Sequence, residues 1–237
     1  MNQLKYNLRT LCKVCVSMVA LFSICYSSLA DAGVALGATR VIYPADQKQV
    51  QLPVTNNDEK STYLIQSWIE NTEGKKDNHF IITPPLFSMK GKKENTLRII
   101  DATNNKLPQD RETLFWLNVK AIPAMEKSKL KENTLQLAII SRIKLYYRPT
   151  KLNMPPEKAS EKLTFSRSGS NLIVNNPTPY YLTVTELNAG TRVLENVLVP
   201  PMNNASVKIP SDAGSEISYR TINDYGALTE KYKTVMR

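Results

Sequence analysis

Short β-branched and aromatic runs, separated by Asn, Asp, Gly and Pro, fill the chain from residue 38 to its C-terminus. Such runs predict strands and turns, and no long helical pattern interrupts them. By residue 148 the runs number seven, the strand number of an immunoglobulin-type sandwich: "ATRVIYP", "QVQLPVTNN", "STYLIQSWIE", "HFIITPP", "NTLRII", "TLFWLNVKAIP" and "ENTLQLAIISRIKLYYR".

A proline-rich break, "RPTKLNMPPEKA" at 148–159, separates this series from a second one. The second series comprises "EKLTFSR", "NLIVNN", "YYLTVTELN", "RVLENVLVP", "NASVKIP", "SEISYRTI" and "ALTEKYKTVM". The sequence therefore predicts an all-β protein of two immunoglobulin-like sandwiches, at 33–148 and 160–237, joined by a linker at 149–159. A single large β-barrel is the alternative, and the proline-rich break argues against it.

The first 32 residues predict a secretory signal peptide. Lys5, Arg9 and Lys13 precede a short apolar run, and Ala30–Ala32 offers a small-x-small cleavage pattern. A transmembrane helix is the alternative, but the run is shorter than the ~20 residues needed to span a bilayer. Cleavage after Ala32 would give an exported chain that begins at Gly33 and is not inserted in a membrane.

The residues that most catalytic and metal sites use are scarce in this chain. Cys12, Cys15 and Cys25 all lie in the expected signal peptide, and His79 is the single histidine, beside Phe80 in a strand-like run. Thiolate and imidazole metal sites are therefore excluded, and His79 is interpreted as structural. No motif marks a glycosidase carboxylate pair, although sequence alone leaves one open. We expect a binding protein without a cofactor or metal, and not an enzyme.

The charge balance is basic. The net charge is +10, and removal of residues 1–32 leaves +8. A basic chain could bind nucleic acid, anionic lipid or acidic protein surfaces. Alternatively, the charge could belong to a solvated face that has no partner. The Lys-rich segments at 89–93 and 125–131 lack the interleaved aromatic residues of a single-strand nucleic-acid platform, so no nucleic-acid partner is expected.

The last strand of the first series is unusually long and apolar. As one strand it would hold roughly 15 residues, where about 5 or 6 are ordinary. Leu135, Leu137 and Ile139 alternate on one side of it. They could fill every second pocket of a partner that pairs with this strand, or they could close the protein's own core.

Two cations favour the interpretation that this strand pairs with a partner. Arg40 lies in the expected first strand and Lys144 in the long strand, and first and last strands can be neighbours in a sandwich. Together the two side chains could capture a carboxylate. In a flat strand, however, Lys144 would face the side opposite to the Leu135, Leu137 and Ile139 side chains, unless a bulge intervenes.

The run "STYLIQSWIE" offers a second surface. Its odd-numbered Tyr63, Ile65 and Ile69 are expected in the core. Leu64 and Trp68 lie on the other side, either as an exposed apolar pair for a partner or beneath a loop.

Several segments resemble the periplasmic pilus-assembly chaperones. "LPQDRETLFWLNVKAIP" at 107–123 is similar to the signature segment of that family, and "TRVIYP", "NND", "TPPLF", "NPTPYYLT" and "INDYGA" match its other motifs. The resemblance covers essentially all of residues 33–237. It implies an L-shaped pair of immunoglobulin-like domains with a cleft between them.

The resemblance also implies roles for particular residues. Leu135, Leu137 and Ile139 would be donated to a pilus subunit that lacks its last strand. Arg40 and Lys144 would anchor the subunit's C-terminal carboxylate. An interdomain ionic network would fall on Glu112, Arg148 and Asp224.

The family also implies partners: fimbrial subunits, including the adhesin subunit, and an outer-membrane usher, with Leu64 and Trp68 as the expected usher contact. The free protein could self-associate through the donor strand. The competing interpretation is an exported two-domain adhesive or structural pilus component, although such subunits normally have one domain and a disulfide.

Overall fold

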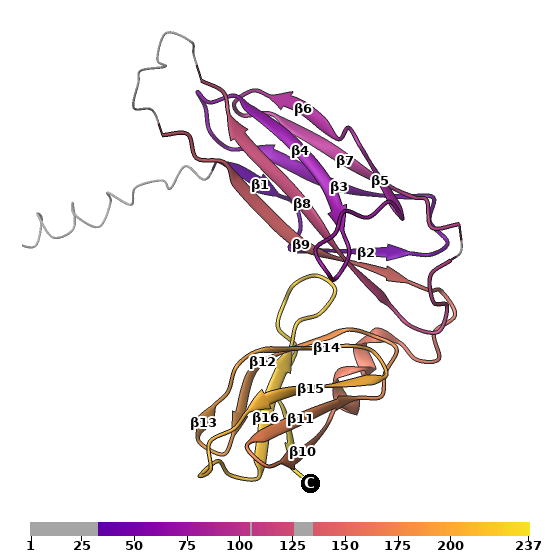
Figure 1. Cartoon of the computed structure of the whole chain (residues 1–237), viewed down its shortest axis with the longest axis vertical. Coiled ribbons are helices and arrows are strands. Elements are labelled where there is room, and N and C mark those ends of the chain that lie inside the picture. The colour runs from indigo at the N-terminus through magenta and orange to yellow at the C-terminus, as the bar shows by residue number, and fades with distance from the viewer. Residues whose placement is uncertain (1–32, 105, 126–134) are drawn as a thin grey trace, which may run out of the picture. The chain divides into compact units, whose positions relative to one another are not determined.

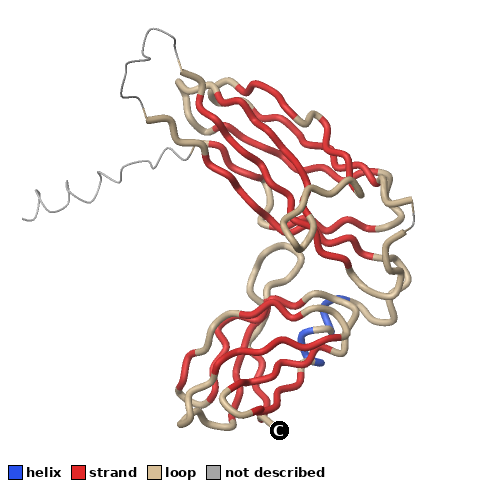
Figure 2. Tube along the Cα trace, viewed as in Figure 1, coloured by secondary structure: helices blue, strands red, loops and turns tan. Residues whose placement is uncertain are grey.

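The computed structural model describes residues 33–104, 106–125 and 135–237, and within them nearly all regular structure is β (Figures 1 and 2). The strands form four sheets around two separate hydrophobic cores. Two cores confirm the two-sandwich prediction and exclude a single barrel. The expected signal peptide and residues 132–134 of the long strand lie outside the described residues.

The N-terminal sandwich packs a four-stranded sheet on a five-stranded one. The first sheet has the order β1-β3-β7-β5 and consists of β1 (Val34–Leu36), β3 (Gln49–Asn56), β7 (Glu94–Asp101) and β5 (Phe80–Thr83). The second has the order β2-β9-β8-β4-β6 and consists of β2 (Arg40–Pro44), β9 (Ile139–Arg148), β8 (Thr113–Pro123), β4 (Tyr63–Glu70) and β6 (Leu86–Met89).

Period-two alternation decides which side chains enter this core. In β4 the odd-numbered Ile65 and Ile69 are fully buried, and Tyr63 packs against the core at its edge, as expected. In β9 the odd-numbered Leu145 and Tyr147 belong to the same core. The Tyr147 ring stacks near Tyr43, with 6.4 Å between ring centroids.

The C-terminal sandwich follows two short 3₁₀ helices, η2 (Pro156–Lys158) and η3 (Ser160–Lys162), at the end of the expected linker. One sheet has the order β10-β11-β15 and consists of β10 (Thr164–Ser168), β11 (Asn171–Asn176) and β15 (Asn203–Lys208). The other has the order β13-β12-β16-β17, with β14 also paired to β12, and consists of β12 (Leu182–Ala189), β13 (Arg192–Val193), β14 (Val197–Val199), β16 (Glu216–Thr221) and β17 (Tyr232–Val235).

Four details differ from the expectation. The run "RVLENVLVP", expected as one strand, forms two, β13 and β14. Two short strands were missed: β1 precedes the expected first strand, and β6 follows Pro85 in the segment "PLFSM". The predicted long strand begins too early, because β9 begins at Ile139 and residues 135–138 precede it as irregular backbone. Alternation continues upstream of Ile139, but backbone pairing with β8 begins there, opposite Ala121.

Candidate binding site

The Arg40 and Lys144 side chains are brought together by a parallel strand pair. β2 runs parallel to β9 with Arg40 directly opposite Lys144, so the expectation that these strands are neighbours is confirmed. The Nζ atom of Lys144 donates a hydrogen bond to Thr183 Oγ1 at 3.0 Å. Arg40 Nη1 donates to the carbonyl oxygen of Ile222 at 3.3 Å. Both acceptors belong to the C-terminal sandwich.

This cation pair has no compensating anion among the described residues. The polar partners of Lys144 and Arg40 are neutral oxygens, and Arg40 Nε is buried without a hydrogen-bond partner. Burial, reinforced by the charge of Arg40, lowers the pKa of Lys144 to about 8. Two partly desolvated cations with unused donors are suited to an anion, and a carboxylate can accept from both.

The parity of β9 separates the cation pair from the apolar side chains. Lys144 and Tyr146 lie on the side that meets the C-terminal sandwich, where the Tyr146 and Tyr181 rings are 5.7 Å apart. The odd-numbered side chains point to the N-terminal core. The described residues of β9 contain no bulge against β8, because the register is continuous from Ile139 to Tyr147. Within β9, Ile139 and Lys144 therefore lie on opposite faces, as the parity predicts, whereas Leu135 and Leu137 precede the strand.

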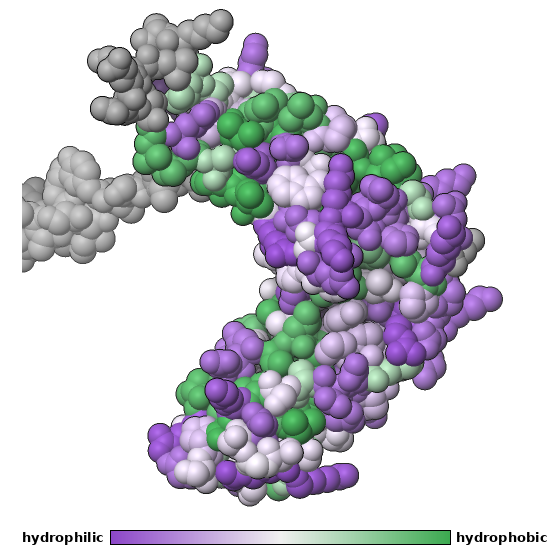
Figure 3. Space-filling model, viewed as in Figure 1, coloured by the Kyte–Doolittle hydropathy of each residue, from purple (hydrophilic) through white to green (hydrophobic). Residues whose placement is uncertain are grey.

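The apolar side chains that precede and begin β9 are exposed. Leu135 is 81% exposed, Leu137 69% and Ile139 66%. None of the three belongs to the N-terminal core, so they do not close that sandwich. Figure 3 shows patches of apolar surface on the N-terminal sandwich.

The strand edge beside these side chains is also free. β2 pairs with β9 only from Lys144 to Arg148, whereas β8 pairs with it from Ile139 to Tyr147. Among the described residues, 139–143 therefore have one strand neighbour, and half of their backbone groups face away from it. An exposed apolar edge of this kind is a template for pairing with another chain.

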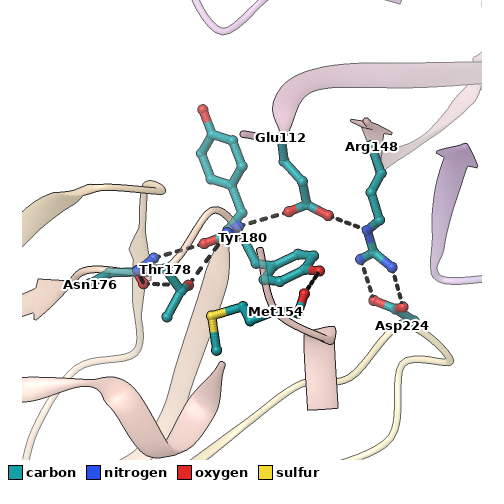
Figure 4. Close-up of polar contacts among 8 residues, drawn as sticks. Glu112, Arg148, Met154, Asn176, Thr178, Tyr180 and Asp224 are labelled. Carbon is teal, nitrogen blue, oxygen red and sulfur yellow. Dashed lines mark hydrogen bonds and ion pairs between the residues drawn. The ribbon is translucent and has the colours of Figure 1, made fainter. Parts of the chain in front are cut away.

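The predicted ionic network is present and joins the two sandwiches (Figure 4). Arg148 Nε donates to Glu112 Oε1 at 2.8 Å. Its two terminal nitrogens bind both oxygens of Asp224, at 2.6 and 2.8 Å. Although burial opposes it, the hydrogen bonds to Asp224 and the charge of Glu112 raise the pKa of Arg148.

Glu112 is the buried member of this network. Its Oε2 atom accepts the backbone N–H of Tyr181 at 2.8 Å, and its own N–H donates to Pro179 O at 2.9 Å. Burial raises the pKa of the Glu112 carboxyl, against the opposing effect of the Arg148 charge. The carboxylate therefore depends on Arg148 for compensation.

The turn that meets Glu112 is built by side chains that the sequence analysis missed. Asn176 Oδ1 accepts the N–H and the hydroxyl of Thr178, and Asn176 Nδ2 donates to Tyr180 O at 2.7 Å (Figure 4). The Tyr180 hydroxyl donates to Met154 O, in the expected linker. The motif "NPTPYYLT" contained the signal, because Asn before Pro and Thr favours such a turn.

A second loop completes the contact between the sandwiches. Asn223 Oδ1 accepts the N–H groups of Tyr225 and Ala227, and Gly226 has φ +85°. A Cβ atom at Gly226 would lie 2.2 Å from Thr39 Oγ1. Glycine is therefore required on both conformational and steric grounds. The loop holds Asp224 at Arg148 and the Ile222 carbonyl near Arg40.

The two expected usher-contact residues differ in exposure. Leu64 is 40% exposed on β4, so no loop covers it. Trp68 is half-buried, and its Nε1–H donates to Glu70 Oε1 at 2.7 Å. The interpretation as an exposed apolar pair is thus right for Leu64 and wrong for Trp68. The contacts of His79 support its interpretation as structural: its Nδ1 lies 2.7 Å from Asp77 Oδ1 and its ring packs near Phe115.

The fold and the site define a β-augmentation protein: two immunoglobulin-like sandwiches with a free, apolar strand edge that ends at an uncompensated cation pair. Two family models match the chain, the N-terminal domain of pili and flagellar-assembly chaperones of the PapD type at residues 33–153 and the C-terminal domain of PapD pili-assembly chaperones at 158–233. The chain belongs to the PapD-like pilus-assembly chaperone family.

Individual relatives agree. The chain is 78% identical over 207 residues to the chaperone protein FimC of Escherichia coli K12, covering 87% of this chain and 86% of FimC. It is similar to the crystal structure of the periplasmic chaperone SfaE, with TM-score 0.77, 65% identity and coverage of 86% and 100%. A Salmonella enterica SafB chaperone in complex with SafA pilin matches with TM-score 0.77, 32% identity and coverage of 86% and 96%.

Within residues 33–104, 106–125 and 135–237, no helix is long and apolar enough to cross a membrane.

Proposed function

We propose that this protein is a periplasmic chaperone that binds fimbrial subunits by donating β9 and the segment before it to a subunit that lacks a strand. The observation that carries the proposal is the free edge at 139–143, flanked by exposed Leu135, Leu137 and Ile139. These side chains would enter the subunit's open groove, and the backbone of the edge would bond the groove's flanking strand. Covering the groove removes an aggregation-prone surface and requires no nucleotide.

The direction of the bound strand follows from β2. β2 runs parallel to β9 and begins at Arg40, opposite Lys144. A subunit strand that pairs with residues 139–143 in the same direction would end where β2 begins. Its terminal carboxylate would then meet Arg40 and Lys144, the cations that lack a described acidic partner. Anchoring there would also fix the register, because a one-residue slip reverses every side chain.

The network of Glu112, Arg148 and Asp224 would hold the two sandwiches in the arrangement that this anchor needs. Lys144 and Arg40 reach acceptors on the C-terminal sandwich, so their positions depend on that arrangement. A buried ion pair adds little net stability but specifies geometry well.

Export and delivery complete the proposal. Residues 1–32 would be removed as a signal peptide by cleavage after Ala32, leaving domains at 33–148 and 160–237 and a linker at 149–159. The loaded chaperone would then reach an outer-membrane usher, with exposed Leu64 in the contact. The relatives are named chaperones, and we propose a non-enzymatic role for this chain.

The test is co-purification from the periplasm with one fimbrial subunit. The intact chaperone is compared with Lys144→Ala and with a matched control, Lys208→Ala, on the exposed face of β15. A stable one-to-one complex that Lys144→Ala loses and Lys208→Ala keeps would support both the donated edge and the anchor. If Lys144→Ala retains the subunit as well as the control does, the carboxylate anchor is wrong. If the intact protein holds no subunit, the donated edge is wrong as well.

A further inference from the structure

The free half of β9 is the part of the sheet with the least support. From Lys144 onward β9 lies between β2 and β8, but residues 139–143 pair with β8 alone within the part of the chain that the structure describes. Ile139 and Ile140 at its start are exposed, so core packing does not hold them. A strand end with one neighbour and few buried contacts tends to fray. For subunit binding, a frayed edge would first have to be ordered.

A cluster of side chains on the outer face of the sheet contacts β9 within residues 139–143. The Arg142 guanidinium carbon lies 4.5 Å from the centre of the Trp116 ring on β8. Arg142 Nη2 also forms an ion pair with Glu70 Oε2 on β4 at 3.2 Å. The other oxygen of Glu70 accepts the indole N–H of Trp68 at 2.7 Å. The cluster thus links three adjacent strands, β9, β8 and β4.

The register explains how the cluster is assembled. Asn118 on β8 lies opposite both Arg142 on β9 and Trp68 on β4. Trp116, two residues away on the same face, lies opposite Glu70. Asn118 is fully buried, in the centre of these larger side chains. The planar guanidinium can stack on an indole and bind a carboxylate at once, which a lysine ammonium cannot do equally well.

The cluster does not have the features of a subunit contact. The guanidinium of Arg142 is already engaged by Glu70 and Trp116, in contrast to the free donors of Arg40. Arg142 is also on the even-numbered side, opposite to Ile139. An exposed ion pair alone contributes little to stability, so its value lies in fixing a position.

We propose that Arg142, held by Glu70 and Trp116, is a positioning residue that keeps residues 139–143 as a preformed edge for the subunit strand. The inference rests on the proposed function, because it assigns a purpose to that edge. Arg142 directly precedes Ile143, the last residue of β9 that has no β2 partner. The cluster therefore holds β9 at the point where its pairing with β2 stops. Binding then requires less ordering of the chaperone.

The test uses the full-length chaperone and two variants that keep side-chain volume. Arg142→Met retains an apolar stem over Trp116 but removes the charge, and Glu70→Gln retains an acceptor for Trp68 but removes the ion pair. Arg192→Met is the matched control, because it breaks the exposed Arg192–Asp212 pair on the C-terminal sandwich. Thermal unfolding confirms that each variant is folded.

Two readouts separate positioning from general stability. The first is hydrogen exchange of the amides in 139–143 that bond to β8, compared with those of Leu145 and Tyr147. The second is the affinity of a synthetic peptide of alternating apolar residues with a free C-terminal carboxylate. The chain has two tryptophans, Trp68 and Trp116, so intrinsic fluorescence reports directly on the cluster.

We expect Arg142→Met and Glu70→Gln to lose protection at 139–143 but not at Leu145 and Tyr147. The peptide's affinity should fall about three- to tenfold, since apparent affinity scales with the populated fraction of the competent state. Unchanged exchange would overturn the proposal, and so would faster exchange with unchanged affinity. The same peptide with a C-terminal amide tests the proposed function separately: equal binding of both forms by the intact protein would refute the carboxylate anchor, not the cluster's role.

Discussion

Replacing Lys144 by Met should change how the stability of the free chaperone depends on pH. In the folded protein the pKa of Lys144 is lowered from 10.5 to about 8, chiefly by burial and then by the charge of Arg40. An unfolded chain holds this proton up to about pH 10.4. Between these two pH values the unfolded state binds more protons, so the free energy of unfolding rises with pH.

The magnitude follows from the size of the pKa change. At about 1.4 kcal/mol per pKa unit, the lowering of the pKa corresponds to roughly 3 kcal/mol. Because Lys144 is only partly buried, solvent screening reduces this to about 1–2 kcal/mol. The charged lysine therefore costs the free protein this amount at pH 7, and the cost disappears as the pH rises from about 8 toward 10.5.

The assay is urea unfolding of the intact protein and of Lys144→Met at several pH values from 7 to 10.5. The difference in unfolding free energy between the two proteins should shift by about 1–2 kcal/mol in favour of the intact protein across this range. Taking differences removes any constant contribution, such as the lost hydrogen bond to Thr183. Lys208→Met supplies the baseline for loss of one lysine. A flat difference, or a shift of opposite sign, would refute the argument that Lys144 is an uncompensated, desolvated cation.

Three other predictions follow from the same contacts. The affinity for a peptide with a free C-terminal carboxylate should fall by up to about tenfold per pH unit above pH 8, as Lys144 loses its proton, whereas the amide form should show no such trend in calorimetric titrations. Arg148→Met should lower the free energy of unfolding by about 3–5 kcal/mol in urea titrations, because it leaves Glu112 buried without a cation; a loss below 1 kcal/mol would contradict this. Leu137→Asp and Ile139→Asp should abolish subunit capture in pull-down assays yet change unfolding free energy by less than about 0.5 kcal/mol, since both positions are exposed; retained capture would remove them from the donor segment.

The sequence predicted those features that a single strand can encode. Alternation in "STYLIQSWIE" placed Ile65 and Ile69 in the core, because a side-chain period of two needs no knowledge of neighbours. The same alternation could not locate the start of β9, since pairing with β8 decides it and an unpaired extended segment has the same pattern. β1, with three residues, is too short to carry a periodicity.

Contacts between side chains of different strands could not be predicted from the alternation within one strand. The Arg142–Glu70–Trp116 cluster depends on the register of three strands, which no local rule supplies. The same holds for Trp68, which is half-buried and hydrogen-bonds to Glu70. The Arg40–Lys144 pair was inferred from the expected neighbouring of the first and last strands, and the family resemblance pointed to the same pair. The network of Glu112, Arg148 and Asp224 came from the resemblance alone. The structure brings the members of each together.

The start of β2 at Arg40 has a consequence for selectivity. The edge of β9 that faces β2 is unpaired as far as Ile143, and from Lys144 on it is hydrogen-bonded to β2. An interior stretch of an unfolded polypeptide could not continue past this point without displacing β2 from the sandwich, whereas a chain that stops there meets two cations. The chaperone would therefore distinguish a polypeptide end from a polypeptide middle. Among the many unfolded proteins that cross the same compartment, this would confine it to those whose last strand finishes with a free carboxylate.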